Sequence, residues 1–186
     1  MNERQKAFSK LSAEALLKSV RVEIENPENF AIAREHLKTG SVLVYFNHFA
    51  KLDVILYGKV MRDNLAPFSD LTAVAARKHF DPKRGKLSQA QKYLVDGWQE
   101  VYGVGLIQVV QPKDKNNYED SDEFNRKSVL KARDLLRTPG KAIGVAPEGT
   151  RSKSNELLQA ENGLELFFRI GNNVLALPLA TEHSSI

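Results

Sequence analysis

Cysteine is absent from the sequence, tryptophan occurs once, and long apolar runs are missing. Without cysteine the chain can form no disulfide, no thiolate metal site and no cysteine nucleophile. None of its apolar runs approaches the ~18 residues needed to span a bilayer. The first 20 residues hold charges but no apolar block of signal-peptide length. These absences predict a cytoplasmic protein.

The excess of positive charge is also small, because 23 acidic residues oppose 27 lysines and arginines and leave a net charge of +4. A dedicated nucleic-acid binder is usually far more basic, so we expect no nucleic-acid partner. Six basic residues do gather between Arg77 and Lys92, with a single acid among them. Such a stretch is typical of a solvated face, or of a surface for phosphates, anionic lipids or an acidic carrier protein.

The sequence does contain a regular alternation of strand-like and helical segments. Short runs rich in apolar and β-branched residues predict strands at 42–46, 71–76, 105–110, 141–146 and 174–180. Helical apolar spacing predicts helices at 52–61, 87–102, 122–137 and 160–170. The polar segment 113–121 is predicted to be a mobile loop. The alternation favours an α/β fold with a central, mostly parallel or mixed sheet flanked by helices.

The first forty residues are predicted to form an N-terminal helical segment, 1–40. Ser12 can cap one helix, and a second is expected from Pro27 to Gly40, with proline at its first turn and glycine after its end. The main domain is predicted over 41–186. Because the chain stops just after its last predicted strand, this domain is expected either to be compact or to lack a C-terminal piece.

The first candidate site follows the predicted strand 42–46 and contains Asn47, His48 and Asp53. Histidine is the usual general base at neutral pH, and an aspartate partner can fix its tautomer and orientation. On one regular helix, five steps of ~100° would leave these two side chains ~140° apart. His48 and Asp53 can therefore meet only if the histidine precedes the helix and the aspartate lies in its first turns. As a bare pair, such residues are common by chance.

The second candidate site, Pro147 to Ser152, follows the predicted strand 141–146. Ligands of α/β sheets collect at the carboxyl ends of strands, where this turn is expected. Gly149 allows close approach of the backbone, and Arg151 offers a planar fork for a phosphate. Thr150 and Ser152 add hydroxyl donors. By itself the segment is also compatible with a turn that carries a surface arginine.

Together the two segments resemble signature blocks of the glycerophospholipid acyltransferases, the family of glycerol-3-phosphate and 1-acylglycerol-3-phosphate acyltransferases. The family pattern N-H-x-S-x-x-D matches at Asn47, His48 and Asp53, and P-E-G-T-R-S matches at every position of 147–152. Pro178, within an apolar strand, resembles a further block of the family. The resemblance covers roughly residues 40–181.

The resemblance implies that 41–186 is an acyltransferase domain. It would move a fatty acyl group from acyl-CoA or acyl carrier protein to the free hydroxyl of 1-acylglycerol 3-phosphate, giving phosphatidate. His48 would be the general base, and Asp53 would stabilise the imidazolium that forms. Arg151 and Thr150 would hold the phosphate of the acceptor, and Glu148 would order the turn. With no cysteine and no serine in a nucleophile elbow, direct transfer without a covalent acyl-enzyme is expected.

Two positions depart from the family pattern. Ala50 replaces the usual serine of the first block, and Gln111 falls where the family has an acceptor-binding arginine. Glutamine cannot hold a phosphate by charge, so Lys113 is the expected substitute, as a point charge without a bidentate fork. Lys78 lies where the family often has a basic residue after its second strand. The predicted substrate-binding residues are Gln111, Lys113, Glu148, Gly149, Thr150, Arg151 and Ser152.

These departures leave other functions open. The acceptor could instead be glycerol 3-phosphate, another lysophospholipid or a non-phosphorylated lipid, or the chain could be a non-catalytic lipid-binding module. The thioester supplies the driving force for the reaction, so we expect no cofactor besides the acyl-CoA or acyl carrier protein co-substrate. No cluster of His, Asp and Glu has metal-ligand spacing, so we expect no metal. Acyl chains reside in membranes, so we expect peripheral attachment to the cytoplasmic face through the N-terminal helices or the basic stretch 77–92. For the helices, ordinary packing against the sheet is the alternative.

Overall fold

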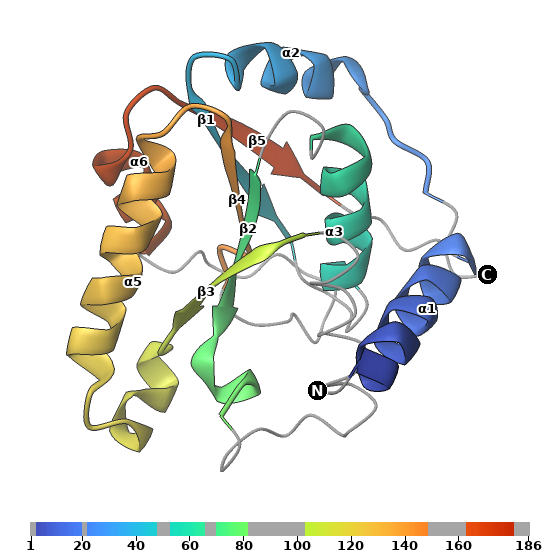
Figure 1. The fold of residues 1–186 in the computed structure, drawn as a ribbon. Helices are drawn as coiled ribbons and strands as arrows, with labels where there is room; N and C mark the ends of the chain where they lie inside the picture. Colours follow the sequence, from blue (N-terminus) through green and yellow to red (C-terminus); the bar gives the residue numbers. More distant parts are fainter. Residues whose placement is uncertain are drawn as a thin grey trace.

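The computed structural model describes residues 3–19, 22–47, 53–65, 70–81, 103–148 and 163–180. Within these ranges the chain forms a sheet with helices on both faces (Figure 1). The strands are β1 (Ser41–Phe46), β2 (Asp70–Ala76), β3 (Gly105–Val109), β4 (Lys141–Val145) and β5 (Val174–Leu179). They pair in the order β3-β2-β4-β1-β5, and every pairing is parallel. The predicted α/β fold is confirmed, with a sheet that is parallel throughout.

The burial of β1 explains why its sequence is so apolar. This strand lies between β4 and β5, and helices cover both faces of the sheet, so five of its six residues are buried and the sixth is half-buried. A central strand of a parallel sheet is shielded on both faces and therefore shows a continuous apolar run, not an alternation of polar and apolar residues.

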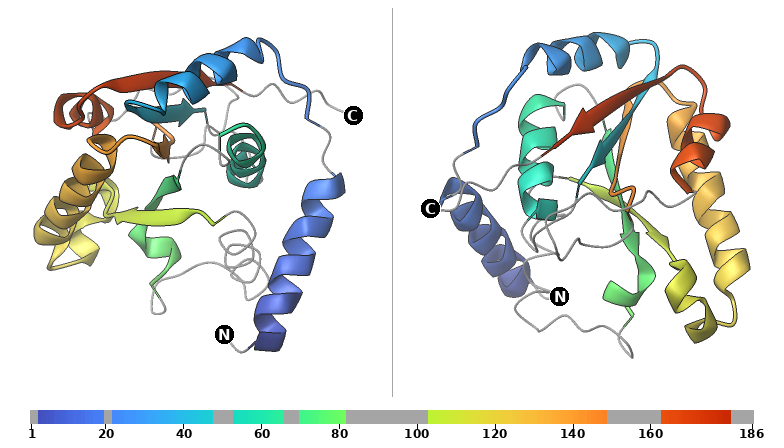
Figure 2. Two further views of the ribbon diagram at one scale, coloured as in Figure 1. Left: turned by 45° about the horizontal axis from the view of Figure 1, so that its top comes forward. Right: turned by 180° about the vertical axis from the view of Figure 1, so that it is seen from behind.

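The α-helices are α1 (Glu3–Ser19), α2 (Glu28–His36), α3 (Asp53–Asn64), α5 (Ser121–Leu136) and α6 (Gly163–Ile170). Two short 3-10 helices, η2 (Arg77–His79) and η3 (Pro112–Asn117), follow β2 and β3. α2 and α3 pack on one face of the sheet, and α5 and α6 pack on the other (Figure 2). α1 lies beside α3. Among the described residues, no helix combines the length and apolarity required to cross a bilayer.

Two apolar cores follow from this layering. Val44 and Met61 belong to the core under α2 and α3, whereas Leu43 and Ile143 belong to the core under α5 and α6. Neighbouring residues of one strand thus enter opposite cores, as the two-residue period of a strand requires. Gly144 faces α3, where an added Cβ would meet the Met61 sulfur at 3.2 Å. This glycine therefore lets α3 pack close to the sheet.

The first helix begins earlier in the chain than the sequence predicted. It runs from Glu3 to Ser19, so the expected N-cap residue, Ser12, lies inside it. Residues 3–11 are mostly strong helix formers such as Glu, Arg, Lys and Ala, and their propensity extends the helix past the serine. The prediction of a cap at Ser12 was therefore wrong.

The predicted mobile loop over 113–121 was also wrong. Most of the segment belongs to η3, which has Pro112 in its first turn, where a missing N–H costs nothing. α5 then begins at Ser121, preceded by Asp120 at the N-cap position, instead of after Asp122. The predicted helix over 87–102 lies outside the described residues.

Candidate active site

The two sequence motifs follow neighbouring strands of the sheet. β1 and β4 are parallel, and Tyr45 is paired with Val145 near their carboxyl ends. Asn47, which opens the first motif, lies two residues beyond Tyr45, and Glu148 of the second motif lies three residues beyond Val145. The structure therefore brings the beginnings of both motifs to the same edge of the sheet.

The strand order makes this edge a topological switch point. From β1 the chain continues through α3 on one face, whereas from β4 it continues to α6 on the other face. Ligands of open α/β sheets bind at the carboxyl ends of two neighbouring strands whose connections leave on opposite faces. Asn47 and Glu148 lie at such a position.

Asn47 is tied to α3 by a buried hydrogen bond. The Tyr57 hydroxyl donates to Asn47 Oδ1, and the Tyr57 ring stacks on Phe46 with their centroids 4.2 Å apart. α3 begins at Asp53, so this aspartate lies in the first turn of the helix, as its predicted pairing with His48 requires. His48 itself lies outside the described residues.

Glu148 is a buried carboxylate at the end of β4. Its side chain is only 6% exposed, and within the described part of the chain Oε2 has no hydrogen-bond partner. A buried acceptor without a hydrogen bond lowers stability. The Oε2 atom is therefore placed to accept a hydrogen bond from a ligand or a neighbouring group. The rest of the motif, Gly149, Thr150, Arg151 and Ser152, lies outside the described residues.

Charged side chains meet at the ends of β2 and β3. Lys78 Nζ donates a hydrogen bond to Gln111 Oε1 at 3.1 Å and forms an ion pair with Asp114 Oδ2 at 2.8 Å. Lys113, the expected substitute for the family arginine, is exposed. The lysine that contacts Gln111 is thus Lys78, from the neighbouring strand. The ends of β2 and β1 are two strand spacings apart, roughly 10 Å.

Arg77 fixes the segment that carries these charges. Its guanidinium lies 4.6 Å from the Tyr118 ring centroid and 4.1 Å from that of Phe124, and Nη1 donates to Asp120 Oδ1 at 2.7 Å. The hydrogen bond from Arg77 lowers the pKa of Asp120 below its ordinary value. In the described part of the basic stretch, both Arg77 and Lys78 are therefore paired with acids.

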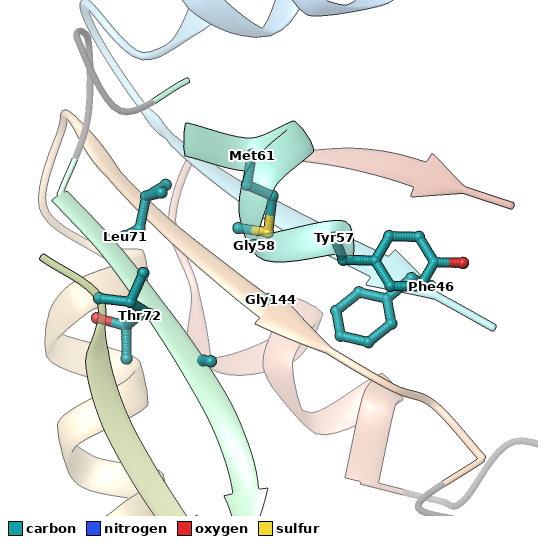
Figure 3. Close-up of a pocket in the computed structure, with 9 residues that line it drawn as sticks. Phe46, Tyr57, Gly58, Met61, Leu71, Thr72 and Gly144 are labelled. Atoms are coloured by element: carbon teal, nitrogen blue, oxygen red, sulfur yellow. The ribbon is translucent and has the colours of Figure 1, made fainter. Parts of the chain in front are cut away.

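An apolar cavity lies beneath α3, next to the Phe46–Tyr57 ring pair (Figure 3). Met61, Leu71 and Gly144 also line it. Its volume is about 20 Å³, which is roughly the space of one water molecule. The cavity is therefore too small to enclose a fatty acyl chain in this structure.

Sequence reasoning missed two residues of this edge. Tyr57 follows Asp53 by one helical turn, which places the two positions on one helix face, but no local signal pairs it with Asn47. Asp114 lies in the segment that was predicted to be a mobile loop, so no partner was expected for it. Among the described residues, no group of three or more histidine, aspartate or glutamate side chains is arranged to hold a metal ion.

The comparison with known families agrees with the motifs. A family model described as Acyltransferase matches residues 21–170, which is most of the chain. No match was found among curated proteins. The matched span includes β1, β4 and both motifs that follow them. The chain therefore belongs to the glycerophospholipid acyltransferase family, whose shared chemistry is acyl transfer in lipid biosynthesis.

Proposed function

We propose that the protein transfers a fatty acyl group from acyl-CoA or acyl carrier protein to the free hydroxyl of 1-acylglycerol 3-phosphate, giving phosphatidate. The observation that supports the proposal is the pairing of β1 with β4, because it brings Asn47 and Glu148, at the beginnings of the two motifs, to one switch point. A base and an anion-binding group are two features that this reaction needs from the protein, besides donors for the oxyanion of the tetrahedral intermediate.

His48 acts as the general base in this mechanism. It takes the proton of the acceptor hydroxyl while the hydroxyl oxygen forms a bond to the thioester carbonyl carbon. When the tetrahedral intermediate collapses, the carbon–sulfur bond breaks and the proton passes from His48 to the departing thiolate. Asp53, at the start of α3, orients the imidazole and stabilises its charged form.

The chemistry requires neither a covalent acyl-enzyme nor a cofactor. The chain has no cysteine, and no serine lies in a nucleophile elbow, so direct transfer between the two bound substrates is the simpler scheme. A thioester is already an activated acyl donor, and its cleavage drives ester formation. We therefore propose a reaction without metal or redox cofactor.

The second motif and the ends of β2 and β3 bind the acceptor. Arg151 and Thr150 hold the phosphate, and the backbone at Gly149 and the hydroxyl of Ser152 complete the turn around it. The buried Glu148 carboxylate orders the turn by accepting a hydrogen bond from the turn or from the substrate. This role accounts for an Oε2 atom that has no partner among the described residues. Lys78, Gln111 and Lys113 lie at the other end of the same edge.

A second candidate function keeps the chemistry and changes the acceptor. Gln111 replaces the family arginine, and the charge of the lysine that contacts it is offset by Asp114. This favours an acceptor without a phosphomonoester, such as a lysophospholipid with a larger headgroup or a neutral lipid. The variant Gln111→Arg tests this candidate function, because it should shift acceptor preference towards 1-acylglycerol 3-phosphate. An unchanged preference would mean that Gln111 does not determine which acceptor is used.

The outer face of α1 supports peripheral attachment to the cytoplasmic face of a membrane. Phe8 and Leu11 are 63% and 65% exposed. They share a helix face with Ala15 and with exposed basic residues at both ends, Arg4 and Lys18. An apolar centre flanked by positive charge is the pattern of a helix that lies in the headgroup region of an anionic bilayer.

Product formation measured by mass spectrometry tests the proposed activity. Protein with vesicles receives acyl-CoA or acyl carrier protein and one acceptor from a panel: 1-acylglycerol 3-phosphate, glycerol 3-phosphate, a lysophospholipid with a larger headgroup or a monoacylglycerol. His48→Ala should lower kcat/KM by ~10²- to 10⁴-fold, the usual contribution of a general base. His36→Gln is the matched control, because His36 contacts Asn173 near the amino end of β1, at the opposite edge of the sheet.

Each outcome has a distinct meaning. A new ester formed by wild type and by His36→Gln, but not by His48→Ala, would support the mechanism, and the acceptor would decide between the two candidate functions. Equal ester formation by all three proteins would overturn the role of His48. If no donor and acceptor pair gave an ester, the non-catalytic lipid-binding module would become the better account.

A further inference from the structure

Tyr57 lies between the candidate active site and the apolar interior. It is 2% exposed, and its ring stacks on Phe46 at the wall of the cavity beneath α3. Figure 3 shows the two rings side by side, with the Tyr57 hydroxyl directed away from Met61 and the cavity. The ring therefore contributes packing, while the hydroxyl extends towards the end of β1, where it donates to Asn47 Oδ1.

The packing of the ring does not explain the hydroxyl. A phenylalanine at this position would stack on Phe46 equally well, whereas a buried hydroxyl costs free energy unless it is hydrogen-bonded. The Tyr57 hydroxyl meets that requirement at the side chain of Asn47, which is itself buried with 9% exposure. Unlike the ring, the hydroxyl thus contributes a hydrogen bond that holds Asn47.

The hydrogen bond connects the end of β1 with the first turns of α3, on either side of the segment that joins them. Asn47 directly follows β1, and Tyr57 lies one turn beyond Asp53, where α3 begins. The two partners are ten positions apart in the chain and bracket both His48 and Asp53. Fixing the two flanks of a short segment limits the conformations open to the residues within it, because the entropy of closure has already been lost.

We infer that Tyr57 is a positioning residue for acyl transfer, whose hydroxyl holds Asn47 so that His48 and Asp53 keep their productive arrangement. The inference rests on the proposed function and adds to it a residue that touches no substrate. A displacement of about 1 Å in a catalytic group can cost ~10²-fold in rate, so loss of this hydrogen bond acts on kcat. Substrate affinity is left to other residues of the edge.

Steady-state kinetics of Tyr57→Phe test the inference, with Tyr45→Phe as the matched control. Tyr45 is the neighbouring tyrosine on β1, half-buried and packed against the opposite core. Tyr57→Phe should lower kcat ~10- to 100-fold at nearly unchanged KM for donor and acceptor, while its melting temperature falls by no more than ~5 °C. Tyr45→Phe should retain kcat within about twofold.

A double-mutant cycle isolates the contact itself. If the hydrogen bond carries the effect, Asn47→Ala and Tyr57→Phe remove the same interaction, and the double variant should lose no more kcat than the worse single variant. If the two substitutions lowered kcat independently, so that the losses multiplied in the double variant, the inference would be overturned. It would also be overturned if Tyr57→Phe were as active as Tyr45→Phe, or if Tyr57→Phe changed only KM.

A readout without turnover separates this inference from the proposed function. The chain has four histidines, so NMR of ring-labelled protein gives few signals, and His48→Ala assigns the one from His48. Tyr57→Phe should shift or broaden the His48 ring signals, and Tyr45→Phe should leave them in place. Unmoved His48 signals in Tyr57→Phe would overturn the positioning role even if wild type showed no acyl transfer with any acceptor.

Discussion

Asp114 pairs with Lys78, a basic residue on the edge of the sheet where we propose that the acceptor binds. The carboxylate lies 2.8 Å from Lys78 Nζ, and the Gln111 amide oxygen lies 3.1 Å from the same nitrogen. A phosphate that binds Lys78 must therefore displace or share an existing anion. If Lys78 assists Arg151 in binding the acceptor phosphate, this aspartate weakens the binding of phosphate-bearing acceptors and so acts on specificity, not on the chemical step.

Replacing Asp114 by asparagine tests that role at the level of one residue. Asparagine keeps the shape and removes the charge, and two unit charges 4 Å apart interact by ~1 kcal/mol in water-like surroundings. We expect KM for 1-acylglycerol 3-phosphate to fall about five- to tenfold, since ~1.4 kcal/mol is tenfold, with little change in kcat or in KM for a neutral acceptor. Initial rates at varied acceptor concentration give both constants.

Asp134→Asn is the control for this substitution, because Asp134 is likewise paired with a basic side chain, that of Arg133, but lies exposed on α5, away from the site. It should leave KM unchanged. A rise in KM for the phosphate-bearing acceptor in Asp114→Asn would mean that Asp114 holds Lys78 in its working position and does not compete with the substrate.

Among the elements, η3 and the start of α5 are organised by Arg77. The guanidinium stacks on Tyr118 and Phe124 and pairs with Asp120, so one side chain at the end of β2 orders the connection that follows β3. Asp120 stands at the N-cap position of α5, but its carboxylate makes no capping hydrogen bond there. The carboxylate instead forms the ion pair with Arg77, which holds this connection beside Lys78.

The pKa of Asp120 predicts how this contact depends on pH. Its pKa lies below the ordinary 3.8, chiefly because of the hydrogen bond from Arg77, so the folded state holds the carboxylate in its charged form more strongly than the unfolded state does. The stabilisation is present above the unfolded pKa and is lost as pH falls through the folded pKa. Wild type should therefore be more stable than Asp120→Asn at pH 7, and the gap should close as pH falls below about 4. Urea titrations from pH 7 to 3 measure it, and a gap independent of pH would contradict the assignment.

At the scale of the whole molecule, the sheet is stabilised by a separate core on each face. Leu43 of β1 is fully buried in the core under α5 and α6. Leu43→Ala should lower the free energy of unfolding by ~2–5 kcal/mol, the usual cost of a buried leucine truncated to alanine. Leu130→Ala, at a position that is 38% exposed on α5, should cost less than ~1 kcal/mol. Denaturant titration compares the two, and equal losses would contradict the layered core.

The proposed membrane attachment is also a question about the whole molecule, and α1 provides its test. Substituting serine for Phe8 and Leu11 together removes the apolar centre of the outer face. Because burial of one such side chain contributes ~1.5–3 kcal/mol, we expect binding to anionic vesicles to fall at least tenfold. Ile32→Ser is the control, since Ile32 is an exposed apolar residue on a different helix, α2.

Sedimentation with vesicles of phosphatidylcholine and phosphatidylglycerol measures this binding, and assays in detergent report whether catalysis is intact. Undiminished vesicle binding by the Phe8 and Leu11 variant would remove α1 from the proposed contact. Equal loss in Ile32→Ser would mean that exposed apolar surface in general, and not the face of α1, attaches the protein.

The sequence by itself determined the fold class, the positions of all five described strands and the two motifs of the site. Central strands such as β1 are buried on both faces, so their apolar runs are visible in a short stretch of sequence. The motifs are equally local, since each spans six or seven consecutive residues. One error, at η3, occurred where contacts between distant segments override local preference, since Arg77 and Lys78 hold this connection from the end of β2. The error at Ser12 was local, because the helix propensity of residues 3–11 outweighed the capping signal.

Only the tertiary structure decided which residues meet. The pairing of β1 with β4 unites motifs 100 positions apart in register, from Val42 with Ala142 to Tyr45 with Val145. Lys78 reaches Asp114 across 36 positions, and Tyr57 reaches Asn47 across the segment that contains both His48 and Asp53. These contacts depend on strand order and on the face to which each helix crosses. Such choices minimise the free energy of the whole chain, and no local pattern of residues records them.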